Sequence, residues 1–252
     1  METVYSGYMS EKATDTPERS LRSDRPERSG RPDRQEPSGL LLRHPDGSSF
    51  RFDPGALCLE LLPTGGPGSL AYFEVLHEPA DLVRWAEESR LPDGLGPGGG
   101  PGSGSRGGPG SGPGPALVVS EGEVADARDL RDALWRLAEG HVEGALPGPD
   151  DLATLNDAAG RPPLAARLTV GGDREWAPGG TGAGLLSTVA RDAVELFTGA
   201  FAHRIRTCGA QGCRLLFVDT SRPGKRRWCS MERCGNRHKV RAHRARLSAA
   251  DQ

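Results

Sequence analysis

Apolar side chains recur along the chain with two periods, and each period predicts a different kind of secondary structure. Short apolar runs bounded by Pro, Asp and Gly predict strands at residues 40–46, 49–53 and 56–62. Apolar residues three and four positions apart predict amphipathic helices. We expect these helices at residues 79–91, 123–140, 151–159 and 185–205.

Each predicted helix has an apolar stripe that should face the core. A hairpin is also expected, with residues 166–170 paired to residues 174–177 around a Gly-Gly-Asp turn. Helices mixed with short strands predict an α+β domain, which we assign to residues 39–203. The helix residues expected in its core are Leu82, Trp85, Ala86, Ala127, Leu130, Leu134, Leu137, Leu186, Val189, Ala193, Leu196, Phe197 and Ala200.

Low-complexity segments precede and interrupt this pattern. Residues 1–38 mix basic and acidic side chains with Ser, Pro and Thr, and contain too little apolar surface to offset the entropy of ordering, so we expect a disordered tail. Residues 94–115 contain 17 Gly or Pro among 22 residues, which predicts a flexible linker inserted in the domain. The stretch GGTGAG at residues 179–184 lacks the Lys and the hydroxyl of a phosphate loop, and we interpret it as a hinge.

Composition and charge add further constraints. The 252 residues include 36 Gly and 21 Pro, so the packed core is smaller than the length suggests. Without a long apolar segment or a signal-peptide pattern, we expect a soluble, cytoplasmic protein. Residues 204–246 contain 13 Lys and Arg against two acids, a net +11, which leaves −13 for the rest of a chain at −2 overall. A basic end of this kind favours a polyanionic partner.

Four of the five cysteines form two equally spaced pairs. Cys208 and Cys213 enclose four residues, as do Cys229 and Cys234, and fifteen residues separate the pairs. Two short-spaced pairs supply the four thiolates that Zn²⁺ binds in a tetrahedral structural site. We therefore expect one structural zinc ion held by these cysteines.

Other interpretations of the cysteines explain less. A thioredoxin-type redox pair needs C-x-x-C at a helix start, and a catalytic Cys–His pair would not explain four clustered thiols. His238 and His243 could compete as ligands, but four thiolates already fill a tetrahedron, so we expect both on an exposed basic face. Cys58, between two leucines, is expected to be a small buried apolar residue.

The sequence around the two pairs predicts the form of a zinc module. Leu215, Phe217 and Trp228 occupy strand-like positions interrupted by a turn at residues 221–224, which suggests a hairpin between the pairs. Ser230 is a good N-cap, and the absence of Pro after it predicts a helix with the last cysteine in its first turn. Knuckle, hairpin and helix make a treble-clef-like unit. So small a unit has almost no apolar core, and we expect it to be unfolded without zinc.

These residues resemble a known family. CGNR at residues 234–237, WCS at residues 228–230 and LFVDTSR at residues 216–222 are similar to the CGNR zinc finger, which we assign to residues 204–247 with a short tail at 248–252. Members of that family carry an N-terminal domain called ABATE and are described as stress-induced transcriptional regulators of bacteria. The resemblance implies an ABATE-like domain between about residues 50 and 201.

The predicted C-terminal helix has the charge density for phosphate contacts. Arg237, Arg241 and Arg244 share one face, and Asn236 with Arg237 could read adenine or guanine edges. Few aromatics lie nearby and those are expected in the core, which favours duplex DNA over single-stranded RNA. The candidate nucleic-acid contacts are Arg226, Arg227, Asn236, Arg237, Lys239, Arg241 and Arg244.

Other hypotheses stay open at this level. The zinc module could dock on a protein, for example the transcription machinery. The N-terminal domain, with a net charge of −11 over residues 40–203, could lie against the basic finger and lower its DNA affinity. That domain could also be a ligand sensor or an enzyme. We find no catalytic carboxylate pair, no Ser-His-Asp arrangement and no cofactor motif, so we do not expect an enzyme.

Overall fold

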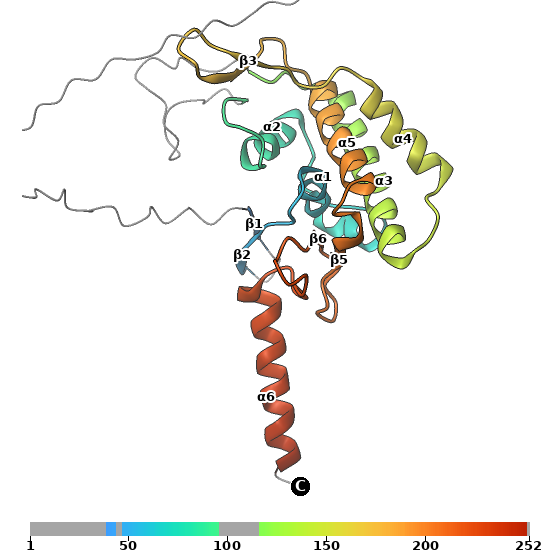
Figure 1. Cartoon of the computed structure of the whole chain (residues 1–252), viewed down its shortest axis with the longest axis vertical. Coiled ribbons are helices and arrows are strands. Elements are labelled where there is room, and N and C mark those ends of the chain that lie inside the picture. Colours follow the sequence, from blue (N-terminus) through green and yellow to red (C-terminus); the bar gives the residue numbers. More distant parts are fainter. Residues whose placement is uncertain (1–38, 44–46, 96–115, 251–252) are drawn as a thin grey trace, which may run out of the picture. The chain divides into compact units, whose positions relative to one another are not determined.

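The computed structural model describes residues 39–43, 47–95 and 116–250. The predicted disordered tail at residues 1–38 and nearly all of the predicted linker at residues 94–115 lie outside these ranges (Figure 1). Within the described ranges, no helix is long and apolar enough to cross a membrane.

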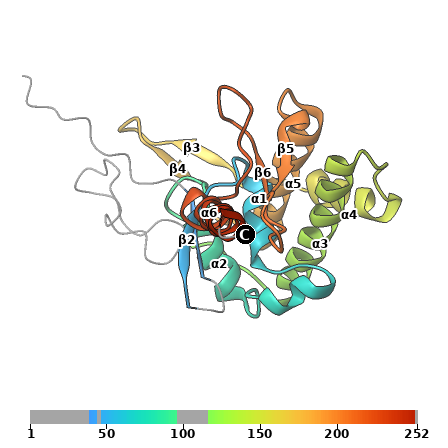
Figure 2. The ribbon, with the colours of Figure 1, turned by 90° about the horizontal axis from the view of Figure 1, so that it is seen from below.

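The described residues form helices and three separate two-stranded antiparallel sheets, the α+β architecture that the sequence predicts (Figure 1, Figure 2). The α-helices are α1 (Leu57–Leu61), α2 (Pro79–Glu88), α3 (Glu121–Glu143), α4 (Pro149–Gly160), α5 (Gly182–Thr198) and α6 (Asn236–Ala250). The strands are β1 (Leu40–Arg43), β2 (Ser49–Phe52), β3 (Ala166–Leu168), β4 (Arg174–Trp176), β5 (Ile205–Thr207) and β6 (Leu216–Val218). Shorter helical turns are η1 (Leu62–Thr64), η2 (Gly68–Phe73), η3 (Ala202–Arg204) and η4 (Met231–Gly235).

Helices α3, α4 and α5 pack side by side and supply much of the core (Figure 1, Figure 2). Every residue predicted for the apolar stripes of α2 and α3 is buried. In α5 the predicted stripe is buried as far as Leu196, whereas Phe197 is half-buried and Ala200 is exposed. Helix α5 ends at Thr198 and does not reach residue 205 as predicted, because Gly199 follows and has a low helix propensity.

Residues 56–62 contain helix α1, so the predicted strand at this place is wrong. All five residues of α1 are buried, and the helix packs against α5. The Cys58 amide donates to the Asp192 carboxylate at 2.8 Å, which caps the start of α1. A short apolar run without alternation is compatible with a buried strand or a buried helix, and Leu and Glu favour the helix. Cys58 itself is fully buried, as predicted.

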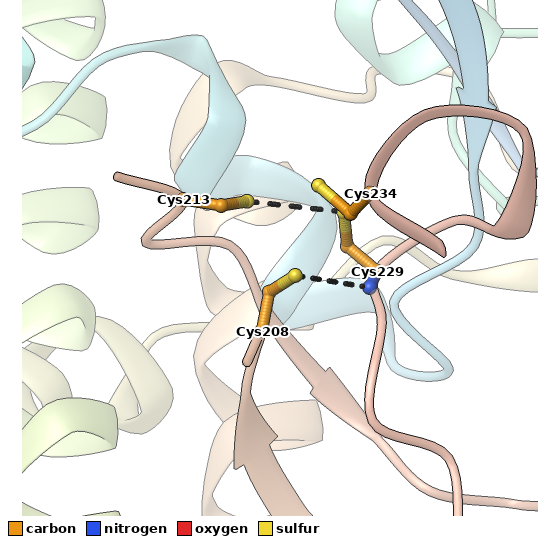
Figure 3. Close-up of side chains that lie close together, drawn as sticks. All are labelled: Cys208, Cys213, Cys229 and Cys234. Atoms are coloured by element: carbon orange, nitrogen blue, oxygen red, sulfur yellow. Dashed lines mark hydrogen bonds between the residues drawn. The ribbon is translucent and has the colours of Figure 1, made fainter. Parts of the chain in front are cut away.

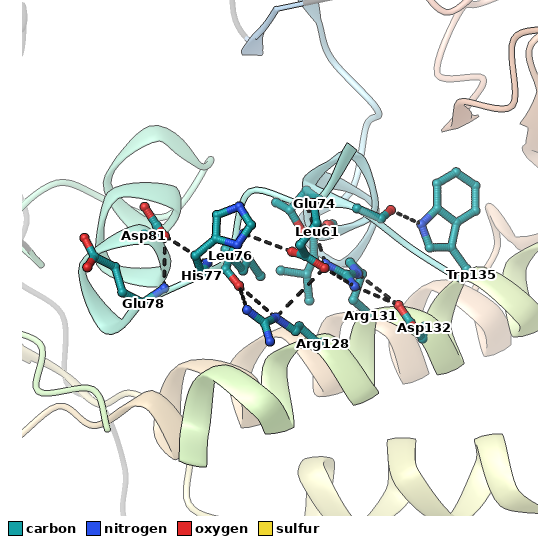
Figure 4. Close-up of polar contacts among 12 residues, drawn as sticks. Leu61, Glu74, Leu76, His77, Glu78, Asp81, Arg128, Arg131, Asp132 and Trp135 are labelled. Carbon is teal, nitrogen blue, oxygen red and sulfur yellow. Dashed lines mark hydrogen bonds and ion pairs between the residues drawn. The ribbon is translucent and has the colours of Figure 1, made fainter. Parts of the chain in front are cut away.

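A buried polar network ties the segment from η1 to Glu74, just after η2, to α3 (Figure 4). Arg131, whose side chain is 2% exposed, pairs with Glu74 at 2.9 Å. The indole Nε1 of Trp135 donates to the carbonyls of Leu62 and Gly65 at 3.0 and 2.9 Å. A Cβ at Gly65, where φ is +151°, would lie 2.6 Å from the Arg131 Nη1, so glycine is needed for this approach. The network holds the segment in place against α3.

The glycine-rich stretch at residues 179–184 binds a carboxylate of the same chain. Glu123, in the first turn of α3, accepts hydrogen bonds from the Ala183 amide at 2.7 Å and from the Ser120 amide at 2.8 Å. A Cβ at Gly182 would lie 2.8 Å from the Glu123 Cδ, so a larger residue would clash with this contact. The N-terminus of α5 therefore binds Glu123 where a phosphate loop would bind a ligand, and the stretch joins α3 to α5.

The strands predicted at residues 40–46 and 49–53 are present and pair with each other, and the hairpin predicted at residues 166–177 is present. Strand β1 pairs with β2, and β3 pairs with β4. The alternation in β2 places Phe50 and Phe52 on its buried face. They form a small second core with residues near the C-terminus, namely Cys208, Phe217, Cys229 and Cys234.

Candidate metal centre and basic helix

The first cysteine pair lies in the connection between β5 and β6, which pair antiparallel. The Cys208 amide extends the ladder to the Leu215 carbonyl at 2.9 Å, and the Cys213 amide closes a turn onto the Ala210 carbonyl at 3.0 Å. The hairpin thus encloses the first pair. The sequence pattern predicts the hairpin between the two cysteine pairs, with Trp228 in its second strand. That position is wrong, because β6 pairs with β5, which precedes the first cysteine.

The second pair lies at the start of the C-terminal helix. Ser230 occupies the predicted N-cap position, although its side chain makes no capping hydrogen bond. The first turn, η4, is a π-helix that contains Cys234, and the Gly235 amide donates to the Ser230 carbonyl at 3.1 Å. Such π-helical turns often occur at functional sites. Regular α-helix begins at Asn236, two residues after the last cysteine.

The four thiol sulfurs lie close together (Figure 3), all within 4.8 Å of one another. The Sγ atoms of Cys213 and Cys229 are 3.8 Å apart, and those of Cys229 and Cys234 are 3.5 Å apart. Four thiolates at about 2.3 Å from a tetrahedral Zn²⁺ lie about 3.8 Å from one another. The Cys229 amide also donates to the Cys208 sulfur at 3.4 Å, a contact that stabilises a thiolate. The cluster therefore fits one zinc ion.

Crowding shifts the pKa values of three of these thiols, those of Cys208, Cys213 and Cys229, in different directions. Hydrogen bonds from Cys213 and Cys229 lower the pKa of Cys208. Donating such a bond to Cys208 raises the pKa of Cys213 and of Cys229. One thiolate is thus stabilised by its neighbours, whereas four thiolates need a cation to balance their charge.

The two nearby histidines lie outside the cysteine cluster found among the described residues. His238 stacks on the Trp228 ring with the centroids 4.7 Å apart. Both His238 and His243 are exposed on α6, as the sequence predicts.

A buried carboxylate orders the loop that leads to the second pair. Asp219, which is 1% exposed, accepts from the amides of Ser221 at 3.0 Å and Arg226 at 2.9 Å. The predicted turn at residues 221–224 closes with the Gly224 amide donating to the Ser221 carbonyl at 3.0 Å. The acid of the LFVDTSR stretch thus shapes the approach to Cys229.

Arg226 is half-buried within this module. Its guanidinium lies 4.2 Å from the centre of the Phe217 ring. It donates to the carbonyls of Asp53 at 2.9 Å, Trp228 at 3.1 Å and Cys229 at 2.6 Å. Burial lowers its pKa, and the nearby Asp53 carboxylate opposes that shift. Arg226 thus connects the end of β2 to the segment around Cys229, and its interpretation as a nucleic-acid contact stays a prediction.

The zinc module also has more core than its size suggests. Ile205, Leu216 and Val218 belong to the main core with α1, α3 and α5. Phe217, which is 0% exposed, packs with β2 in the small second core. The prediction of a unit with almost no apolar core is therefore wrong, because β5 and β6 share the core of the preceding domain within one compact unit, Pro37–Gln252.

Helix α6 carries most of the remaining candidate contacts. Those of its side chains that the structure describes are exposed, except for the half-buried Ala242. Arg237, Arg241 and Arg244 line one cleft together, as their spacing predicts. Lys239 lies about 200° around the helix from Arg237, on the opposite face.

Two other candidates are partly engaged. The Asn236 side-chain amide donates to the Glu232 carbonyl at 3.3 Å, within the helix. Arg227 is exposed and its guanidinium lies 5.0 Å from the centre of the Trp228 ring. Both lie at the surface of the zinc module, where the sequence places them.

Sequence reasoning gave no role to three residues of this region. Arg233 lies between the second pair of cysteines; its guanidinium is 4.7 Å from the centre of the Phe50 ring, and its Nε has no hydrogen-bond partner among the described residues. Ser48 and Ser49 line the cleft along α6. The position of Arg233 next to Cys234 could have identified it as a residue of the site. No local sequence signal identifies Ser48 and Ser49, because their position in the cleft depends on how β2 packs.

Two family models match this sequence. The ABATE model, described as a "putative stress-induced transcription regulator", matches residues 55–200, and the CGNR zinc finger model matches residues 204–247. Comparison with curated proteins gave no match. The first model covers more than half of the chain, and the second contains all four clustered cysteines. The chain therefore belongs to the ABATE family and carries a C-terminal CGNR zinc finger.

Proposed function

We propose that this protein is a zinc-dependent transcription regulator that binds duplex DNA through the basic face of α6. The observation that carries the proposal is the position of α6, which begins two residues after Cys234. Zinc binding would therefore fix where the helix starts and where its arginines point. Arg237, Arg241 and Arg244 then align three guanidinium groups along one face, as contacts to a phosphate backbone require.

Base recognition is a finer part of the proposal. Arg237 suits the edge of guanine, and Asn236 suits adenine. Asn236 would have to exchange its bond to the Glu232 carbonyl for a base. We therefore assign most of the affinity to phosphate contacts by Arg237, Arg241 and Arg244, to which base recognition by Asn236 and Arg237 would add specificity.

We assign the regulatory role to the N-terminal domain. A cavity of about 840 Å³ lies among β1, the η1–η2 segment, α2 and the zinc knuckle. It is lined by Trp85 and Trp135 of the domain and by Cys213 of the knuckle. Its size suits a small ligand, its lining combines apolar and charged side chains, and Cys213 places a zinc ligand in its wall. The cavity supports ligand sensing better than it supports an acidic domain that covers the basic helix. Glu139 of the domain pairs with Arg214 of the zinc module at 2.5 Å, but the described side chains of α6 stay exposed, apart from the half-buried Ala242.

Selection of bound sequences from random duplex DNA tests the main proposal. We expect enrichment with the zinc-loaded protein and none with Cys229→Ser, which removes one ligand. No enrichment with parent protein that binds one zinc per chain would contradict DNA binding.

A specific observation favours docking on a protein as the second candidate. Met231, Val240 and Leu247 of the zinc module are apolar and about half exposed, at 51, 48 and 54%. Val240 and Leu247 are seven residues apart and therefore lie on one face of α6, an arrangement that suits a partner helix or groove. Binding to a protein partner should survive competition by short duplex DNA, whereas binding through the arginines of α6 should not.

A further inference from the structure

A cleft of about 480 Å³ runs between α6 and the hairpin formed by β1 and β2. The hairpin precedes both family-model matches, which begin at residues 55 and 204. The family assignment therefore gives the hairpin no role. The cleft is lined by Ser48, Ser49 and Phe50 from the hairpin side and by Glu232, Arg233, Asn236, Arg237, Val240, Arg241 and Arg244 from η4 and α6.

The lining is strongly basic. Four arginines face a single acid, Glu232, among the described lining residues. The apolar lining is limited to Phe50 and Val240. A concave basic surface of this kind concentrates polyanions and offers little to an apolar ligand.

Both walls of the cleft are anchored to the metal centre. On the hairpin side, Phe50 and Phe52 share a core with the cysteines, and the Arg233 guanidinium lies over Phe50. The Arg226 side chain also donates to the carbonyl of Asp53, directly after β2, at 2.9 Å. On the other side, α6 follows the last ligand. The separation of the walls is therefore set before a ligand enters, which reduces the cost of binding.

The hairpin wall supplies neutral donors opposite the arginines. Ser48 and Ser49 are exposed, and both line the cleft. Serine hydroxyls donate to phosphate oxygens, and proteins combine them with arginines along a nucleic-acid backbone.

We propose that this cleft holds the sugar–phosphate backbone of one DNA strand, with the arginines of α6 on one side and Ser48 and Ser49 on the other. The inference rests on the proposed function and extends the interface to a segment that neither family model covers. In a duplex, the backbone of one strand forms a ridge that can enter the cleft.

The test measures the affinity of the full-length, zinc-loaded protein for a duplex at a series of salt concentrations, by fluorescence anisotropy. Arg241→Gln should weaken binding and reduce the salt slope by about 0.9. The double variant Ser48→Ala/Ser49→Ala should weaken binding about tenfold without changing the slope, because it removes hydrogen bonds and no charge. Ser48→Thr/Ser49→Thr keeps both hydroxyls and should restore the affinity. Ser69→Ala, an exposed serine of η2 outside this cleft, is the matched control.

The outcomes separate this inference from the proposed function. If the parent binds DNA and Arg241→Gln weakens it while the double alanine variant binds like the parent, the hairpin has no part in the interface and the inference is overturned. If the parent binds no duplex DNA, both proposals fail.

A second variant guards against loss of folding. Ser49→Glu should weaken binding far more than Ser69→Glu, which adds the same charge elsewhere; equal losses would also overturn the inference. Zinc content and circular dichroism confirm that each variant is folded.

Discussion

Two neighbouring arginines should respond in opposite ways to replacement by glutamine. Arg226→Gln removes three hydrogen bonds to backbone carbonyls and the contact over Phe217. Because the residue is half-buried, we assign about 1 kcal/mol to each bond and about 0.5–1 kcal/mol to the ring contact. The loss is then about 3.5–4 kcal/mol, which for a unit of this size lowers Tm by roughly 7–16 °C.

Arg227→Gln is the matched control. Arg227 is exposed, so its loss should change Tm by no more than about 1–2 °C. If Arg227 contacts a phosphate, the slope of duplex affinity against salt should fall by about 0.9 for this variant, whereas it should stay constant for Arg226→Gln.

Thermal unfolding of the zinc-saturated variants, followed by far-UV circular dichroism, measures the first effect, and anisotropy measures the second. Arg226→Lys keeps the charge but not the forked geometry and should recover only part of the Tm. An unchanged Tm for Arg226→Gln together with a reduced salt slope would refute the structural role of this side chain.

Three further predictions concern the metal, the shared core and pH. Removal of zinc by a chelator should speed hydrogen exchange at residues 231–250 while β5 and β6 stay protected by the main core; exchange throughout the chain would contradict this. A zinc-loaded fragment of residues 204–252 should lack the native fold, because Ile205, Leu216 and Val218 lose their partners; a well-dispersed amide NMR spectrum like that of the full chain would contradict it. Burial alone would raise the pKa of Glu123, but hydrogen bonds from the Ser120 and Ala183 amides outweigh burial and lower that pKa. The Glu123 carboxylate therefore stabilises the fold above its unfolded-state pKa, and this contribution is lost as the pH falls through its folded-state pKa. Below about pH 4 the parent should therefore lose Tm more steeply than Glu123→Gln, and parallel curves would contradict this.

Periodicity located the long helices because their apolar stripes are the surfaces that the core buries. Helix α3 needs only its own sequence to be found, since Ala127, Leu130 and Leu134 are all buried at the expected spacing. Periodicity could not decide between helix and strand for residues 56–62, because a segment that is buried on every side has no polar face to show its period.

The metal ligands could also be predicted, because the spacing of the cysteines reflects the chemistry of the ion. The orientation of the Arg226 side chain could not be predicted, because one of the carbonyls it binds, that of Asp53, lies 173 residues earlier in the chain. The same applies to Ser48 and Ser49, whose place in the cleft follows from the packing of Phe50 and Phe52 on the zinc module. Local sequence shows which residues are charged, whereas long-range packing decides which of them reach a ligand.

The claim tested most directly is that the cleft face of α6 binds duplex DNA when zinc is bound. The measurement is the salt dependence of duplex affinity for the zinc-loaded parent, for the variant with Arg237, Arg241 and Arg244 all replaced by Gln, and for a control with Lys239 and Arg246 replaced. With at least three phosphate contacts we predict a slope of about −2.7 or steeper for the parent. That slope should collapse in the triple variant and be largely kept in the control. A triple variant that keeps the parent's slope and affinity would contradict the claim.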